Sequence, residues 1–332
     1  MHENRVSRLG TALVAGALAA SLGAPLLAPH RADQRFAGLL NAPPTRPRLV
    51  DADGSVHAPF IYGWRLSNRL EQRYEEDRSQ RIPLEWWTGG AVVRSSDETS
   101  APLLLLGADS FGRDVFSRLI FGGRTSLALA AVAALSAVIL GGLLGGIAGY
   151  LGGTVDEGLM RATDFIMVLP ATYVALALRA VLPLVLPAGV VFALLASIFA
   201  LLGAPFIARG VRAIVRSERR LDYASAAQAL GASDVRLLLL HLLPATRGFI
   251  AVELTMLVPA FIVAEATLSY VGLGFPDPVA NWGTMLHDAA NVSVFADFPW
   301  LLSPAAAMFL VVLGLNLLLQ GPSFSRHVRL PM

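Results

Sequence analysis

The chain has 332 residues, of which 55% are apolar and 15% are charged, and its formal net charge is +2, a composition typical of membrane proteins. All 26 basic residues are arginine, and the missing lysine excludes a Walker A ATP-binding loop and Schiff-base catalysis. Because a Walker A lysine is missing, any ATP-driven work must be powered by a different chain. The absence of cysteine excludes disulfides, thiolate metal sites and a cysteine nucleophile.

Long apolar runs predict the membrane spans. A helix needs about 20 apolar residues to cross a bilayer, and about six stretches approach or reach that length. They lie at 9–29, 125–149, 164–183, 187–208, 248–271 and 300–320. The prolines of LPLVLP (182–187) favour a break between the third and fourth stretches. We therefore expect an all-α membrane protein with about six transmembrane helices.

The N-terminal residues 1–29 are predicted to form a transmembrane anchor. The alternative is a cleaved signal peptide, because Arg5 and Arg8 precede an apolar run that contains GALAAS. The length of the run favours a retained span. Both interpretations place residue 30 outside the cytoplasm.

Residues 30–124 are predicted to form an extracytoplasmic insert that ends in an interfacial helix. The sequence RLSNRLEQRYEEDRSQRIP (65–83) suggests a charged, solvated helix. Residues 112–120 suggest an amphipathic helix in the membrane interface, either a gate-side helix or an anchor. Its polar face carries Arg113, Asp114, Ser117 and Arg118. The insert either caps the outer ends of the spans or contacts an external partner.

The arginines of the short loops predict the orientation of the core, residues 125–320. Segment 209–247 holds seven arginines, whereas segment 272–299 holds none. Because arginine-rich short loops face the cytoplasm, the first segment is predicted to be cytoplasmic and the second external. Six spans then place both termini in the cytoplasm, including the tail 321–332.

The stretch LDYASAAQALGASDVRLLLLHLLPA (221–245) is too charged to cross a bilayer, since each central Asp or Arg costs roughly 2.5–3.5 kcal/mol. Helical spacing places small residues on one side, and glycine favours a turn at the end of that helix. We expect a short helix that docks into a groove of another protein; the alternative is an amphipathic linker on the membrane. The candidate docking residues are Asp222, Tyr223, Ala226, Ala227, Leu230, Gly231 and Asp234, and the return to the membrane involves His241, Leu243 and Pro244.

Three motifs carry a family resemblance. The spacing from Ala226 through Gly231 to Pro244 resembles the cytoplasmic loop of ABC importer permeases, although Ser225 stands where that family usually has Glu and His241 where it often has Ile. GADSFGRDVFSRLIFGGRTSL (107–127) and AEATLSYVGLGFPDPVANWGTML (264–286) resemble the dipeptide, oligopeptide and nickel importer permeases, and specifically their C-type subunit. The resemblance covers about 107–320 and leaves out 30–106.

The resemblance implies a type I ABC importer permease fold in the bacterial cytoplasmic (inner) membrane. It implies a coupling helix that sits in a cleft of an ATPase subunit, and peptide import by alternating access; nickel or another small solute is the alternative. The expected partners are a second permease subunit in a heterodimer, two ATPase subunits that bind ATP and Mg, and an extracytoplasmic substrate-binding protein. This chain itself is expected to bind no cofactor and to have no enzymatic activity.

Ionisable residues inside spans are costly and often functional, so Arg179, Glu253 and Glu265 are candidates for the translocation path. The alternative is structural hydrogen bonding between helices. Gly141, Gly145 and Gly149 lie four residues apart, which favours close helix packing within the chain over a seam with a partner permease. We find no catalytic, metal-binding or nucleic-acid-binding motif, and no inverted repeat. An intramembrane hydrolase and a stand-alone secondary transporter are therefore disfavoured.

Overall fold

The computed structural model describes residues 2–51, 54–69, 71–181, 183, 186–290 and 297–319. These residues belong to two compact units, which we describe separately. Unit 1 comprises residues 1–14, 128–268 and 311–332, and unit 2 comprises residues 15–127 and 269–310. The predicted tail 321–332 lies outside the described residues.

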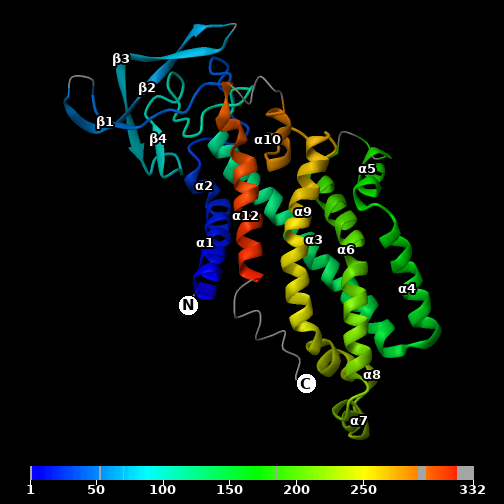
Figure 1. The fold of residues 1–332 in the computed structure, drawn as a ribbon. Coiled ribbons are helices and arrows are strands. Elements are labelled where there is room, and N and C mark those ends of the chain that lie inside the picture. Colours follow the sequence, from blue (N-terminus) through cyan, green and yellow to red (C-terminus); the bar gives the residue numbers. More distant parts are fainter. Residues whose placement is uncertain are drawn as a thin grey trace. The chain divides into compact units, whose positions relative to one another are not determined.

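Helices account for most of the described chain (Figure 1). The α-helices are α1 (His2–Leu22), α2 (Ala24–Leu27), α3 (Val115–Leu151), α4 (Gly153–Val168), α5 (Ala171–Val181), α6 (Ala188–Glu218), α7 (Asp222–Ala229), α8 (Asp234–Leu237), α9 (Arg247–Tyr270), α10 (Trp282–Asp288) and α12 (Ser303–Leu319). A π-helical turn, η1 (Leu238–Leu242), and a 3-10 turn, η2 (Leu243–Thr246), join α8 to α9. A further 3-10 turn, η3 (Pro299–Leu302), precedes α12.

Four helical stretches among the described residues are long and apolar enough to cross a membrane. They are Val115–Leu151, Ala188–Glu218, Asp234–Tyr270 and Pro299–Leu318. They agree with four of the predicted spans, at 125–149, 187–208, 248–271 and 300–320. The prediction of six spans is therefore supported for four of them by length and composition.

The two remaining predicted spans are not single helices. In the first, α1 ends at Leu22 and the short α2 follows Gly23. In the third, α4 ends at Val168 and α5 begins after Pro170. Leu169 is extended, with φ −74° and ψ 129°, because the ring of a following proline disfavours helical backbone at the residue before it. A continuous apolar run thus concealed a break within 164–183.

The expectation of an all-α chain is wrong for the insert. Four strands form an antiparallel sheet in the order β1-β2-β3-β4: β1 (Arg48–Val50), β2 (Val56–Asn68), β3 (Arg73–Trp86) and β4 (Val93–Ser95). The predicted charged helix 65–83 is instead the distal part of the β2–β3 hairpin, with Trp64 opposite Glu76 and Asn68 opposite Arg73.

The insert has its own apolar core, which explains why a hairpin forms there. Ile61 of β2 and Ile82 of β3 pair across the ladder and pack with Ala101 and Leu103. Burying these side chains contributes on the order of 1.5–3 kcal/mol for each large one. The charged residues between them lie on the exposed part of the ribbon, where their spacing is compatible with a strand as well as with a helix.

The predicted interfacial helix at 112–120 is also revised. Helix α3 begins at Val115 and continues without a break to Leu151. The residues assigned to a solvated polar face are buried: Arg113, Asp114, Ser117 and Arg118 are each at most 2% exposed. A separate amphipathic helix on the membrane surface is therefore excluded.

Close packing of α3 on α6 organises unit 1, as the glycine spacing predicted. A Cβ atom added to Gly141 would lie 2.5 Å from the Ala204 carbonyl oxygen, and one added to Gly149 would lie 2.7 Å from that of Arg212. Gly145 is closer still to Ala208. Helix α9 packs against α6, where the rings of Phe199 and Phe261 stack with centroids 5.4 Å apart. In Figure 1, α6 and α9 run side by side, and α3 crosses the view obliquely.

Candidate functional site

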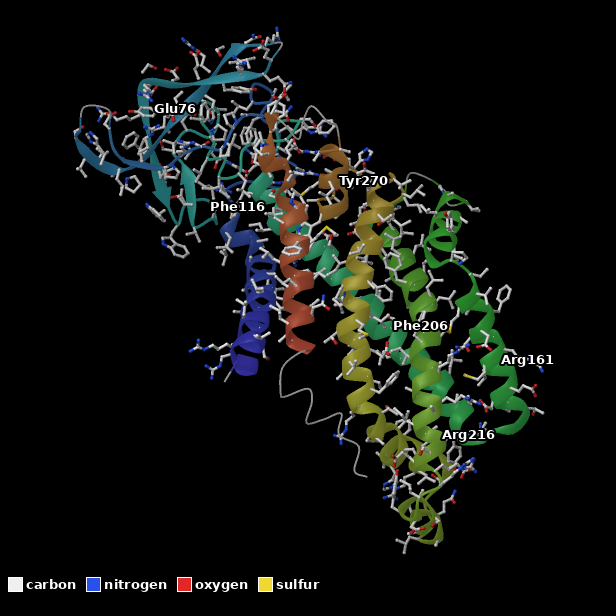
Figure 2. All side chains as sticks on the ribbon, viewed as in Figure 1. Glu76, Phe116, Arg161, Phe206, Arg216 and Tyr270 are labelled. Carbon is white, nitrogen blue, oxygen red and sulfur yellow. The ribbon has the colours of Figure 1, made fainter. Side chains whose placement is uncertain are left out.

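The candidate coupling loop, residues 209–247, begins at the arginine-rich end of α6. In Figure 2, charged side chains gather at the end of unit 1 where Arg161 and Arg216 are labelled, whereas Phe206 lies among apolar side chains. Arg212 donates to Asp156 of α4 at 2.5 Å, and Arg216 lies 3.5 Å from the same carboxylate. Arg209 forms an ion pair with Asp164 of α4. These arginines thus join α6 to α4.

The hydrogen bond from Arg212 holds the pKa of Asp156 below its usual range. An ionised carboxylate is therefore maintained at neutral pH, and it attracts both Arg212 and Arg216. From the sequence alone, the arginines of 209–247 predicted only which side of the membrane the loop faces. Their carboxylate partners on α4 lie 56 and 45 residues away from Arg212 and Arg209 respectively, which is why the chain pattern did not reveal them.

Helix α7 is short because residues that favour the beginning and the end of a helix lie close together in its sequence. Asp222 occupies the first turn, where a carboxylate interacts favourably with the helix dipole. Gly231 has φ +88°, and the next amide, that of Ala232, donates to the Ala227 carbonyl at 3.0 Å. This left-handed glycine ends the helix, as expected from the sequence. Ser233 then caps α8 by accepting from the Arg236 amide.

The expected docking face of α7 is open to solvent. Leu230 is 89% exposed and Tyr223 is 40% exposed. Ala226 and Gly231 are exposed between them, whereas Ala227 is half-buried. Ala224, elsewhere on α7, is buried. The result is a flat surface of small residues with a projecting leucine at its end.

Tyr150, at the last turn of α3, holds the loop in place. Its hydroxyl donates to Asp234 and accepts from the Gln228 side chain at 3.4 Å. Arg219 donates to the Tyr150 carbonyl, and its guanidinium lies 4.6 Å from the centroid of the Tyr150 ring. Sequence reasoning missed Tyr150, because its only signal was an aromatic residue beside the last glycine of the α3 stripe.

Tyr223 is anchored at the start of α7. Its hydroxyl donates to Glu218 Oε2 at 2.7 Å. Partial burial, reinforced by the acceptor Glu218, raises the pKa of Tyr223 to about 12. Tyr223 is therefore a neutral donor at physiological pH, and its ring is presented beside the exposed alanines.

The segment between α8 and α9 changes from a π-helical turn, η1, to a 3-10 turn, η2. Leu237 and Leu242 are fully buried, whereas His241 is exposed. Pro244 lies at the start of the 3-10 turn, where its missing N–H is tolerated, and Leu243 begins that turn. The helical path from Asp234 to Tyr270 is continuous through these turns.

The predicted path residues are placed as follows. The side chain of Arg179, on α5, lies outside the described residues. Glu253 is half-buried on α9, and Glu265 is fully buried on the same helix with an interaction partner. Twelve residues of α-helix separate the two glutamates, so their directions differ by about 120°. The structure does not bring them to one face of α9.

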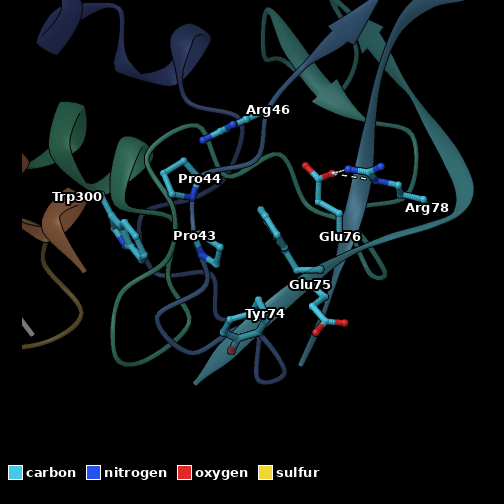
Figure 3. Close-up of a pocket in the computed structure, with 9 residues that line it drawn as sticks. Pro43, Pro44, Arg46, Tyr74, Glu75, Glu76, Arg78 and Trp300 are labelled. Atoms are coloured by element: carbon cyan, nitrogen blue, oxygen red, sulfur yellow. Dashed lines mark hydrogen bonds and ion pairs between the residues drawn. The ribbon is translucent and has the colours of Figure 1, made fainter. Parts of the chain in front are cut away.

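Unit 2 contains a cavity of about 710 Å³ between β3 and the loop that precedes β1 (Figure 3). Prolines and aromatic rings line it together with charged groups of both signs. The lining residues are Pro43, Pro44, Arg46, Trp64, Tyr74, Glu75, Glu76, Arg78 and Trp300. Glu76 is paired with Arg48 and Arg78. Aromatic rings with arginine are typical of surfaces that contact another protein.

Comparison with known proteins identifies the family of the chain. Residues 141–321 match the family model described as "Binding-protein-dependent transport system inner membrane component". The chain is similar to the oligopeptide transport system permease protein OppC of Bacillus subtilis (strain 168), with 36% identity over 216 residues that cover 65% of this chain and 68% of that protein.

Two further relatives have similar coverage. The glutathione transport system permease protein GsiD of Pectobacterium atrosepticum is 37% identical over 216 residues, which cover 65% of this chain and 69% of that protein. The dipeptide transport system permease protein DppC of Bacillus subtilis (strain 168) is 34% identical over 215 residues, which cover 65% of each chain. The family match includes the whole of 209–247.

Proposed function

The chain belongs to the family of binding-protein-dependent transport system inner membrane components, and from this membership we propose that it is the permease subunit of an ATP-driven importer of peptides. It works in a bacterial cytoplasmic membrane as a multi-pass protein, with both termini in the cytoplasm. Its partners are a second permease subunit, two ATPase subunits and an extracytoplasmic binding protein. The ATP and Mg are bound by the ATPase subunits.

The exposed face of α7 is the observation that carries this proposal. Leu230 is 89% exposed at the end of a helix that is fixed from behind by Tyr150. An exposed leucine beside small residues costs free energy in water and gains it when a partner groove covers the surface. The residues that contact the ATPase are Asp222, Tyr223, Ala226, Ala227, Leu230, Gly231 and Asp234.

Force from the ATPase reaches the membrane helices by two routes. Tyr150 connects α7 and α8 to the end of α3, and the Arg212–Asp156 pair connects α6 to α4. When ATP draws the ATPase subunits together, the docked loop moves with them. The helices tilt in response, and a translocation pathway through the membrane opens alternately to its two sides. Hydrolysis of ATP resets the arrangement.

The peptide assignment is supported by the names of the relatives, which describe oligopeptide, glutathione and dipeptide permeases. Nickel or another small solute is the second candidate, because permeases for these solutes share the motifs at 107–127 and 264–286. Competition between labelled dipeptides, labelled oligopeptides and Ni²⁺ in uptake assays separates the two. Import of Ni²⁺ alone would contradict the peptide assignment and leave the importer assignment intact.

The test of coupling is Leu230→Glu in the complex reconstituted with its ATPase subunits. A charge in the docking groove should reduce ATPase co-purification and uptake by more than about tenfold, because about 1.4 kcal/mol of lost docking energy is a factor of ten. The matched control is Val56→Glu, at an apolar residue that is 76% exposed in the insert. Normal co-purification with Leu230→Glu, or ion-driven uptake by this chain without ATPases, would contradict the proposal.

A further inference from the structure

Arg113 lies at the centre of a buried ion cluster in unit 2. Its guanidinium is 2.7 Å from Asp109, 2.8 Å from Asp277 and 2.7 Å from Asp288, and its side chain is 3% exposed. Arg118 adds a second buried guanidinium, 3.5 Å from Asp109 and 3.9 Å from Asp288. We call these five residues the ion cluster. They join the segment before α3 to residues 277–288, which we call the α10 segment.

Three aspartates balance three arginines when the edge of the ion cluster is included. Arg35 pairs with Asp277 at 2.8 Å, and its backbone is bridged to that of Arg113. Only an arginine can direct several N–H donors in fixed directions toward separate carboxylates. Burying such charges is costly unless each has partners, so the arrangement specifies one position for the α10 segment.

A second, uncharged set of contacts holds the same two segments together. The Trp282 indole N–H donates to the Leu119 carbonyl at 3.0 Å, and the Trp282 amide donates to the Ser126 hydroxyl at 3.3 Å. A Cβ atom on Gly122 would lie 3.2 Å from the Asn281 backbone. The α10 segment is thus fixed along the first turns of α3 at its beginning, middle and end.

We propose that Arg113 is a positioning residue for transport, which fixes the α10 segment on the start of α3 so that loop and helix move as one body when access changes. This inference rests on the proposed importer function. It predicts that the α10 segment changes position only when α3 does, and that it does not open as an independent flap.

The first test measures uptake together with ATP hydrolysis in the reconstituted complex. Arg113→Gln and Arg113→Lys should each lower uptake roughly tenfold or more, because the α10 segment is no longer held on the start of α3. ATP hydrolysis should fall less, so the ATP consumed per solute rises. The control is Arg31→Gln, which removes an exposed arginine paired only with nearby Asp33. Full uptake with Arg113→Lys, or an unchanged ratio of ATP to solute, would overturn the proposal.

The second test does not depend on transport and uses the natural absence of cysteine. Arg124 on α3 and His287 on α10 are exposed and do not belong to the ion cluster, so Arg124→Cys with His287→Cys gives an accessible pair that leaves the cluster intact. Spin labels on the two cysteines should keep one distance with and without ATP. A second distance with ATP would overturn the rigid-body assignment. If the unmodified complex imports nothing, the importer function fails while the distances still test the rigid body.

Discussion

The coupling loop and the ion cluster hold their segments in different ways. In the coupling loop, small and apolar residues face solvent, and the anchoring groups are a tyrosine and a few partly exposed polar side chains. In the ion cluster, two guanidiniums and a carboxylate are almost completely removed from solvent. The first arrangement leaves a surface for a partner, whereas the second uses its polar groups internally. The docking surface is recognised by its exposed apolar residues, whereas the ion cluster, which fixes two segments together, is recognised by its buried charges.

Asp109 allows the most direct test of whether burial makes the ion cluster a fixed contact. This carboxylate accepts from the Arg113 side chain at 2.7 Å and from the amides of Phe111 and Arg113, each at 2.9 Å. Asp109→Ala should destabilise the α10 segment by about 3–5 kcal/mol, because two buried arginines then share too few carboxylates. Hydrogen exchange of the 281–290 amides measures the loss. Asp33→Ala, in an exposed pair, is the control and should change exchange by less than about 1 kcal/mol. Equal effects would show that burial does not distinguish the ion cluster from an exposed ion pair.

Acid should weaken the two units in different pH ranges. Burial lowers the pKa of His30, in unit 2, from 6.5 to about 4, while the Leu103 carbonyl opposes the shift and Arg94 adds to it. Between these values the unfolded state binds the proton first, so stability present above about pH 6.5 is lost as the pH falls toward 4. At about pH 5 the loss is on the order of 2 kcal/mol. In unit 1, the pKa of Asp156 is lowered, so the stability that this carboxylate contributes is present above its usual pKa of 3.8 and is lost only as the pH falls below that value.

Hydrogen exchange at about pH 5 and about pH 7.5, corrected for intrinsic rates, checks this difference. The amides around His30 should lose protection at the lower pH, whereas those of α4 should keep it. His30→Gln removes the titrating group, so its pH dependence in this range should be flatter than that of the unmodified chain. The same pH dependence in both chains would contradict the assignment of the loss to His30.

Sequence patterns predicted the features that are local in the chain. The glycine spacing predicted the contact of α3 with α6, and Gly231 marked the end of α7, because a small residue at a defined interval has a direct backbone consequence. The apolar runs predicted four long helices for the same reason. The candidate docking residues fall on one short segment and could therefore be proposed together.

Features that depend on distant partners could not be predicted. Arg113 is 164 residues from Asp277 and 175 residues from Asp288, so its polar character was interpreted as exposure to solvent. The 65–83 segment was predicted to be a charged, solvated helix, because its own residues do not reveal that Ile61 pairs with Ile82 across a hairpin. The prolines of 182–187 predicted a break, whereas Pro170, inside the predicted span 164–183, was not considered as one.

Substitutions at Gly231 can distinguish the effect of backbone strain from the effect of side-chain size in the coupling loop. Its φ is +88°, and apart from its chain neighbours no heavy atom of the described residues lies within 4 Å of a Cβ placed there. Gly231→Ala should therefore cost about 1 kcal/mol through backbone strain alone, whereas Gly231→Asn should cost less because Asn tolerates left-handed backbone. Exchange of the 225–232 amides measures the difference. Equal protection in both variants would indicate that the turn tolerates any residue and that glycine has another role.

The smallest expected effect concerns Tyr150, the anchor that the sequence did not reveal. Tyr150→Phe keeps the ring that faces Arg219 and removes only the hydroxyl that contacts Asp234 and Gln228. A net hydrogen bond at a partly exposed site contributes about 0.5–1.5 kcal/mol, so exchange of the α8 amides should rise by a small factor while α3 stays protected. Tyr223→Phe is the control, since its hydroxyl contacts Glu218 and not α8. Increased exchange of α8 with Tyr223→Phe but not with Tyr150→Phe would place the anchor on the wrong tyrosine. A comparable rise in α3 would mean that Tyr150 supports the helix end itself, and the coupling loop would then resemble the ion cluster in being part of a single packed body.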